Sequence, residues 1–152
     1  MYRARIIDAG LEGHLPIQGL SPKQIAEIEA AQGVVVPSAY RDFLLECGES
    51  AGLLCDDAEF FYPALKYLKQ DLQEILSDND EDVRGFEFDL PPNALVIGSY
   101  QGRQHDYLIC DGTNDPPVHR LVIMKGSTQL QESFTSYIAR MIDSYQKAQK
   151  YF

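Results

Sequence analysis

A chain of 152 residues is long enough to bury one hydrophobic core and short for two full domains. Its 45% hydrophobic and 24% charged residues are typical of a globular protein. We therefore expect a single domain over residues 1–152. Because no apolar run approaches the roughly 20 residues of a membrane-spanning helix, we expect the protein in the cytoplasm. Because the formal net charge is −10, we expect it to bind neither nucleic acid nor membranes.

The amino-terminal third carries one short β-like stretch and one clear helix signal. Residues 2–8 contain β-favouring tyrosine and isoleucine side chains and predict a short edge strand. Ser21 is placed to act as an N-cap, Pro22 occupies the first helical position and Gln24 completes a capping box. A helix is therefore predicted from Pro22 to about Gly33.

Two further helices are predicted before the middle of the chain. Ser38 is placed to cap the first of them, and Gly48 is expected to end it in the left-handed conformation. Apolar residues spaced i, i+3, i+4 and i+7 give this helix one continuous buried stripe, formed by Tyr40, Phe43, Leu44 and Cys47. The next helix is predicted over about residues 63–77, followed by a solvated loop to Asp89.

The second half of the chain changes from helical to strand periodicity. Short apolar runs at 94–98, 106–111 and 117–123 are separated by Gly, Asn, Asp and Pro, which predicts consecutive antiparallel strands. A final helix is predicted to begin near Ser133. The pattern predicts an α+β fold in which an antiparallel sheet of about four to six strands packs against amino-terminal and carboxy-terminal helices.

Acidic residues are concentrated in one insertion-like region, residues 56–91, which we call the acidic segment. It holds eleven acidic residues and three basic ones, whereas the rest of the chain is nearly balanced. Such a localised field attracts cationic protein surfaces. Charge runs are usually solvated faces that keep a protein soluble. We weigh that interpretation evenly against a partner-binding surface made of Asp56, Asp57, Glu59, Asp78, Asp80, Glu81, Asp82, Glu87 and Asp89.

Aromatic residues alternate with these acids and favour the binding interpretation. Aromatic side chains rimmed by charge form plausible anchors for a basic protein. Some of these rings are equally suited to a core, Phe61 and Phe86 above all. The set comprises Phe60, Phe61, Tyr62, Phe86 and Phe88.

Signals for catalysis or metal binding are weak. The three cysteines, Cys47, Cys55 and Cys110, lack CxxC spacing and are predicted to be reduced and mostly buried. A second group could supply metal ligands, but strand alternation would scatter it over both faces of a sheet. It consists of His105, Asp106, Cys110, Asp111 and His119.

Two motifs imitate functional loops without completing them. An EF-hand-like series begins at Asp78 and ends at Asp89, but Val83 stands where the calcium loop needs glycine. In residues 98–102 the serine comes one place too early for a nucleophile elbow. We therefore expect no enzyme activity, metal or cofactor.

The order of elements resembles that of the SUKH superfamily. The resemblance spans roughly Leu20 to Gln146 and depends on core and turn residues. These are Val36-Pro37-x-x-Tyr40-Arg41-x-Phe43-Leu44, Gly48, Leu95-Val96-Ile97-Gly98, Leu108-Ile109-Cys110-Asp111, Pro117-Val118 and Ser133-Phe134-x-x-Tyr137-Ile138. The chain has Cys47-Gly48-Glu49-Ser50 where many members carry an Asn-Gly-Gly-like turn, so the resemblance implies the scaffold and not a particular binding site.

The resemblance also implies a class of function. The superfamily includes Smi/Knr-type fungal cell-wall regulators and many bacterial immunity proteins, which act by binding other proteins. Bacterial members commonly neutralise a cognate toxin, often a nuclease. We therefore expect a protein partner, most simply a basic toxin domain, and keep as an alternative a regulatory or scaffold protein without a toxin.

Overall fold

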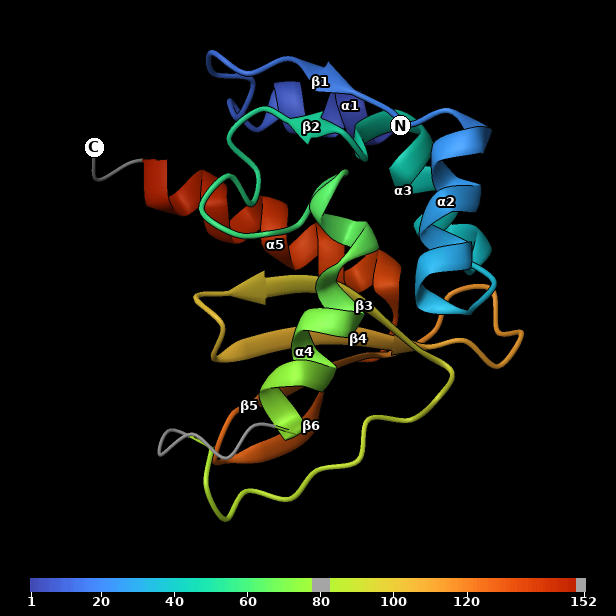
Figure 1. Ribbon diagram of the computed structural model, residues 1–152. Helices are drawn as coiled ribbons and strands as arrows, with labels where there is room; N and C mark the ends of the chain where they lie inside the picture. Colours follow the sequence, from blue (N-terminus) through green and yellow to red (C-terminus); the bar gives the residue numbers. More distant parts are fainter. Residues whose placement is uncertain (78–82, 150–152) are drawn as a thin grey trace.

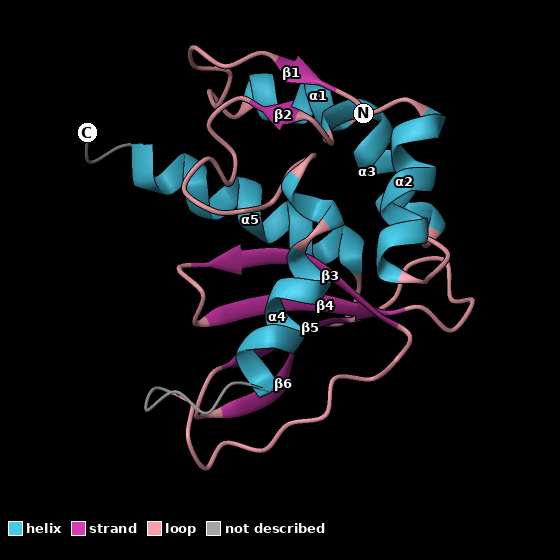
Figure 2. Ribbon diagram, in the orientation of Figure 1, coloured by secondary structure: helices cyan, strands magenta, loops and turns pink. Residues whose placement is uncertain are grey.

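The computed structural model describes residues 1–77 and 83–149 and shows a four-stranded antiparallel sheet with helices on both of its faces (Figure 1). Helix α4 crosses the front of the sheet in Figure 1, and helix α5 lies behind it. The amino-terminal helices gather at one end of the sheet (Figure 2). The predicted α+β architecture is confirmed.

The amino-terminal stretch forms helix α1 (Tyr2–Asp8), so the predicted edge strand is wrong. Tyr2 and Ile6, four positions apart, are both buried, whereas Ile7 is exposed. That spacing places both apolar side chains on one helical face, but residues i and i+4 share a face in a strand as well, so the spacing alone did not distinguish the two structures. The Tyr2 ring packs edge-on against Phe43 with centroids 5.4 Å apart, which fixes α1 to the helix that carries Phe43.

Helix α2 (Pro22–Gln32) begins and ends as its sequence predicts. The Gln24 backbone N–H donates to the Ser21 hydroxyl, and the Ser21 N–H donates to the Gln24 side chain, which completes the capping box. Gly33 follows the helix with φ of 69°, a left-handed conformation that glycine adopts without strain.

Helix α3 (Ser38–Cys47) buries the predicted stripe, but its two ends differ from the prediction. Pro37 is the N-cap, and Ser38 is the first helical residue and caps nothing. Gly48 has φ of −69°, so it is not a left-handed cap. Glycine is needed at position 48 for lack of space, because a Cβ there would lie 2.6 Å from the Leu20 side chain and 2.7 Å from the Leu44 carbonyl oxygen.

Residues 49–77 lead from the helical end of the molecule onto the sheet. Strands β1 (Ile17–Gln18) and β2 (Ser50–Ala51) pair antiparallel as a small separate ribbon. The third predicted helix is divided in two: a 3₁₀ turn, η1 (Ala64–Lys66), precedes helix α4 (Leu68–Ser77).

The main sheet follows chain order, with strands β3 (Ala94–Tyr100), β4 (Gln104–Ile109), β5 (Val118–Val122) and β6 (Gly126–Gln131). The three predicted strands are confirmed as consecutive antiparallel partners. Strand β6 was not predicted, because its sequence is polar and only half-buried and so lacks the apolar signal of an inner strand.

Helix α5 (Phe134–Gln149) covers the rear face of the sheet, as predicted for the carboxy-terminal helix. It buries Phe134, Tyr137, Ile138 and Ile142. Phe134 also meets Tyr40 and Phe43 of α3 edge-on, with ring centroids 5.0 and 5.9 Å apart. The core therefore lies between α3, α5 and the sheet.

On the front face, two buried polar side chains, Gln32 of α2 and Lys69 of α4, link these helices to each other, to η1 and to the sheet. The Gln32 amide nitrogen donates to the Leu65 and Val96 carbonyls at 2.8 and 2.9 Å, and its oxygen accepts from the Val96 N–H at 2.8 Å. The Lys69 ammonium donates to the carbonyls of Gln32 and Pro92 at 2.8 and 2.7 Å. These contacts hold α4 in register with α2 and β3.

The described helices include none that is both long and apolar enough to cross a membrane. The three cysteines are free, with Cys47 and Cys55 buried and Cys110 half-buried, which confirms the prediction for them. Burial raises the pKa of the Cys47 thiol to about 12.

Candidate functional site

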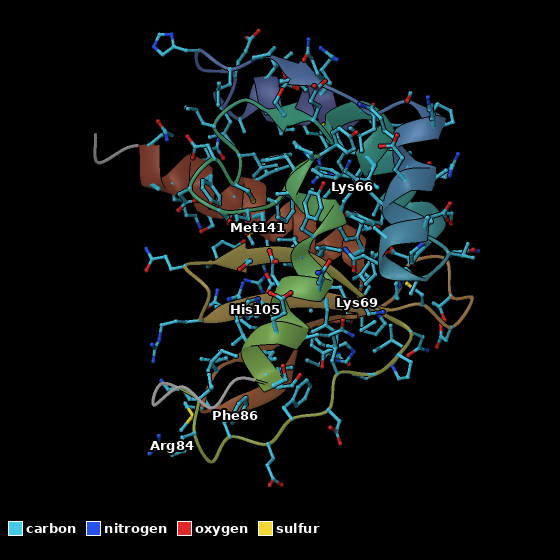
Figure 3. All side chains as sticks on the ribbon, viewed as in Figure 1. Lys66, Lys69, Arg84, Phe86, His105 and Met141 are labelled. Carbon is cyan, nitrogen blue, oxygen red and sulfur yellow. The ribbon has the colours of Figure 1, made fainter. Side chains whose placement is uncertain are left out.

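A pocket of about 540 Å³ opens between α4, the edge of the sheet and the loop at residues 56–59. Figure 3 labels His105, which comes from the sheet and lies next to α4. Four carboxylate side chains line the pocket: Asp56, Asp57, Glu59 and Asp71. Within the described chain no lysine or arginine lines it.

Glu59 is placed by an isolated antiparallel bridge to the edge of β3. Its backbone N–H donates to the Ser99 carbonyl at 3.0 Å, and the Ser99 N–H donates to the Glu59 carbonyl at 2.9 Å. Successive side chains of an extended backbone point to opposite sides. Glu59 and Ser99 therefore line the pocket, while Phe60 is buried and packs against the Tyr137 ring of α5.

Asp71 belongs to the pocket because of its position on α4. Leu68, Asp71 and Ile75 are spaced i, i+3 and i+7, so they share the helical face that lines the pocket. Lys69, two residues earlier, has its ammonium buried against backbone carbonyls, and burial lowers its pKa. This cation is directed away from solvent and adds little positive charge to the exposed surface of α4.

Asp57 connects the loop to the rear helix. The Tyr145 hydroxyl of α5 donates a hydrogen bond to the Asp57 carboxylate. The loop at 56–59 is thus attached at one end to α5 and at the other to β3, which fixes the positions of its acidic side chains. Preorganised groups of this kind bind without the entropic cost of ordering a mobile loop.

His105 supplies a neutral acceptor to the pocket. Its Nε2 atom lies 3.1 Å from the Gly102 carbonyl oxygen, which can only accept, so Nε2 carries the proton. Burial lowers the pKa of the imidazole and keeps it neutral. Nδ1 then bears a lone pair, and this buried atom has no hydrogen-bond partner among the described residues.

The predicted binding residues divide into three groups. Asp56, Asp57 and Glu59 line the pocket. Glu87 and Asp89 are exposed on the loop between α4 and β3 and do not line it. The remainder of the predicted set lies outside the described residues: Asp78, Asp80, Glu81 and Asp82.

The sequence did not place Asp71 or His105 in the partner-binding set, and it considered His105 only as a possible metal ligand. A signal for Asp71 was present, because an acidic residue sits among the apolar positions of the α4 stripe. No sequence signal placed His105 beside the acidic loop. His105 meets Gly102 only through the turn between β3 and β4. The loop at 56–59 comes near His105 only through the bridge between Glu59 and Ser99.

The aromatic residues of the acidic segment serve mainly the core. Phe60 is 1% exposed, so it offers no surface to a partner. Phe61 and Phe86 are half-buried against the core, in agreement with the structural interpretation considered for them. Phe88 is half-buried beside the Tyr107 ring, with centroids 6.5 Å apart.

The residues considered as metal ligands do not converge. His105 lines the pocket in front of the sheet, whereas Asp106 points to the rear face and binds Arg120 and Tyr137. His119 stacks on the Tyr107 ring with centroids 5.2 Å apart. The described part of the chain holds no group of three or more His, Cys, Asp or Glu residues placed to bind one metal ion.

The scaffold around this pocket matches a known family. Residues 19–140 fit the sequence model of the SMI1/KNR4 family (SUKH-1), which is well over half of the chain. The chain belongs to this family. The SUKH resemblance in the sequence is confirmed, and the matched range extends from just before α2 into α5. No curated protein matches the chain closely enough to add a named relative.

Proposed function

We propose that this SMI1/KNR4-family chain is an immunity-type protein that binds a basic toxin domain and covers its active site. The observation that carries the proposal is the pocket at 56–59 and α4, where four carboxylates converge and no basic side chain neutralises them in the described chain. In this proposal the chain acts in the cytoplasm by binding alone, without catalysis, cofactor or metal.

Charge supports a protein partner of basic character. The formal net charge of −10 is mostly carried by the acidic segment, whose helix α4 crosses the front of the sheet (Figure 1). A surface of one sign steers an oppositely charged protein and raises the association rate about 10- to 1,000-fold at low salt. Catalytic domains that act on nucleic acid are commonly basic, which makes a nuclease a fitting partner.

The test is neutralisation of a candidate toxin. A gene beside that of this chain, encoding a large secreted protein with a nuclease-like carboxy-terminal domain, would supply the candidate. That domain should stop bacterial growth when expressed alone, and co-expression of this chain should restore growth. A purified candidate that neither binds this chain nor is neutralised by it would contradict the proposal.

Charge reversal tests the surface separately from the activity. Replacing Asp80, Glu81 and Asp82 by lysine should slow association about tenfold at low salt and leave the fold intact. Glu87→Lys with Asp89→Lys, at exposed positions of the described loop, should act in the same direction. Asp8→Lys with Glu12→Lys is the matched control, since both residues are exposed near α1. An unchanged association rate in both test variants would exclude this surface.

The alternative is a regulatory or scaffold protein without a toxin. The matching family model is named for SMI1/KNR4 proteins, and this family name favours the regulatory alternative. A gene neighbourhood without any toxin-like protein, combined with a stable complex with a host protein, would support it over the immunity role.

A further inference from the structure

The ionisable side chains of the pocket present only hydrogen-bond acceptors, and the donors in its lining are neutral, the Ser99 hydroxyl and the Gln101 amide. Carboxylates accept and cannot donate when ionised, and the Nδ1 atom of a neutral His105 protonated at Nε2 also accepts only. His105 is 2% exposed, and Nδ1 has no partner among the described residues. A buried acceptor left without a donor costs about 1–3 kcal/mol. A ligand that fits this pocket must therefore bring several donors and a positive charge.

We propose that the pocket receives an arginine side chain of the bound partner, whose guanidinium faces Asp56, Glu59 and Asp71 and donates to Nδ1 of His105. This inference rests on the proposed function and names the chemical group by which the partner is recognised. Asp57, already bound by Tyr145, holds the loop in place.

Guanidinium fits this arrangement better than an ammonium or a metal ion. The acceptors come from three separate elements, the loop at 56–59, α4 and β4, and they surround a space of about 540 Å³. Arginine presents five donors in a planar fork that can reach several acceptors at once, whereas lysine is a compact point charge. A metal ion would need oxygen ligands that converge within about 2.0–2.6 Å. Leu68 and Ile75 provide an apolar wall for the aliphatic part of the side chain.

The experiment is an NMR titration of the ¹⁵N-labelled full chain with acetyl-Gly-Arg-Gly-amide. Long-range ¹H–¹⁵N spectra report each histidine ring nitrogen. The Nδ1 signal of His105 should shift in the direction of hydrogen-bond acceptance and saturate, while His14, exposed before β1, should not move. The matched peptide with citrulline, which keeps the shape without the charge, should cause no shift. A static His105 signal, or an equal response to citrulline, would overturn the proposal.

Side-chain variants identify the carboxylates that bind the arginine side chain. Glu59→Gln and Asp71→Asn should each weaken arginine-peptide binding about three- to fivefold, as expected for a solvent-accessible ion pair. Glu74→Gln, on the same helix but outside the pocket lining, is the matched control and should change nothing. Unchanged binding in both test variants, or tighter binding of the matched lysine peptide, would contradict the guanidinium assignment.

The same variants separate this inference from the proposed function. A toxin that is neutralised equally well by the Glu59→Gln and Asp71→Asn variants would overturn the arginine pocket and leave the immunity role standing. An arginine peptide that shifts His105 in a chain that neutralises no candidate toxin would leave the pocket standing and overturn the immunity role.

Discussion

Arg120 of β5 and Asp106 of β4 form a two-hydrogen-bond ion pair beneath helix α5. The guanidinium donates from Nε to Oδ1 at 2.7 Å and from Nη2 to Oδ2 at 3.0 Å. Asp106 is 0% exposed and also accepts from the Tyr137 hydroxyl at 2.7 Å. The two residues are direct cross-strand partners, so the register of the sheet places them together. The hydrogen bond to Asp106 raises the pKa of Arg120.

Removing one member of this pair should destabilise the fold strongly. Arg120→Met leaves a carboxylate buried without its cation, which costs about 3–5 kcal/mol in the free energy of unfolding. Urea denaturation followed by circular dichroism measures it. Asp143→Ala is the matched control, because the Asp143–Lys147 pair is exposed and contributes about 0.5 kcal/mol or less.

The double variant distinguishes a paired charge from simple packing. Asp106→Leu combined with Arg120→Met removes both charges and should be more stable than Arg120→Met alone. If the double variant were less stable than Arg120→Met, the unpaired Asp106 carboxylate would not be the source of the stability lost in Arg120→Met.

Gln32 should be needed for the attachment of α2 to β3. Gln32→Leu keeps a similar size but removes the donor to Leu65 and both bonds to Val96, so we expect a loss of about 2 kcal/mol or more in unfolding free energy. Hydrogen exchange at the Val96 amide should accelerate as well. Gln73→Leu, on the exposed side of α4, is the control and should leave Val96 protected. Unaltered exchange at Val96 in Gln32→Leu would contradict the role.

The buried His105 and the half-buried His119 should make stability fall on the acid side of neutrality. Burial lowers the pKa of His105 from its ordinary 6.5 and prevails over the Gly102 carbonyl and the carboxylates of Asp106 and Glu59, which act in the opposite direction. Burial lowers the pKa of His119 too. The unfolded chain then binds more protons than the folded one, so the contribution is complete above pH 6.5 and is lost as the pH falls toward the folded-state values.

The measurement is the free energy of unfolding at several pH values between about 7 and 5, where histidine titrates. His105→Gln should flatten the dependence, because glutamine keeps an N–H donor toward Gly102 and does not titrate. His14→Gln, at an exposed position, should leave it unchanged. An identical slope in His105→Gln and the unmodified chain would show that His105 is not responsible.

Local signals in the sequence determined an element's boundaries where its ends depend on contacts within a few residues. The capping box at Ser21 and the glycine at position 33 fix both ends of α2 through contacts within a few residues, so the sequence was sufficient there. Gly48 was misinterpreted because its neighbour Leu20 lies far back in the sequence. Strand β6 was missed because an edge strand needs no continuous apolar run, and its position follows from pairing with β5.

The sequence by itself determined the α+β class, the SUKH scaffold and the concentration of acid in residues 56–91, since each depends on side-chain type and short spacing. Only the tertiary structure decided that Glu59, Asp71 and His105 face one pocket, because a bridge to β3, a helical turn of α4 and a strand of the sheet bring them together from distant positions.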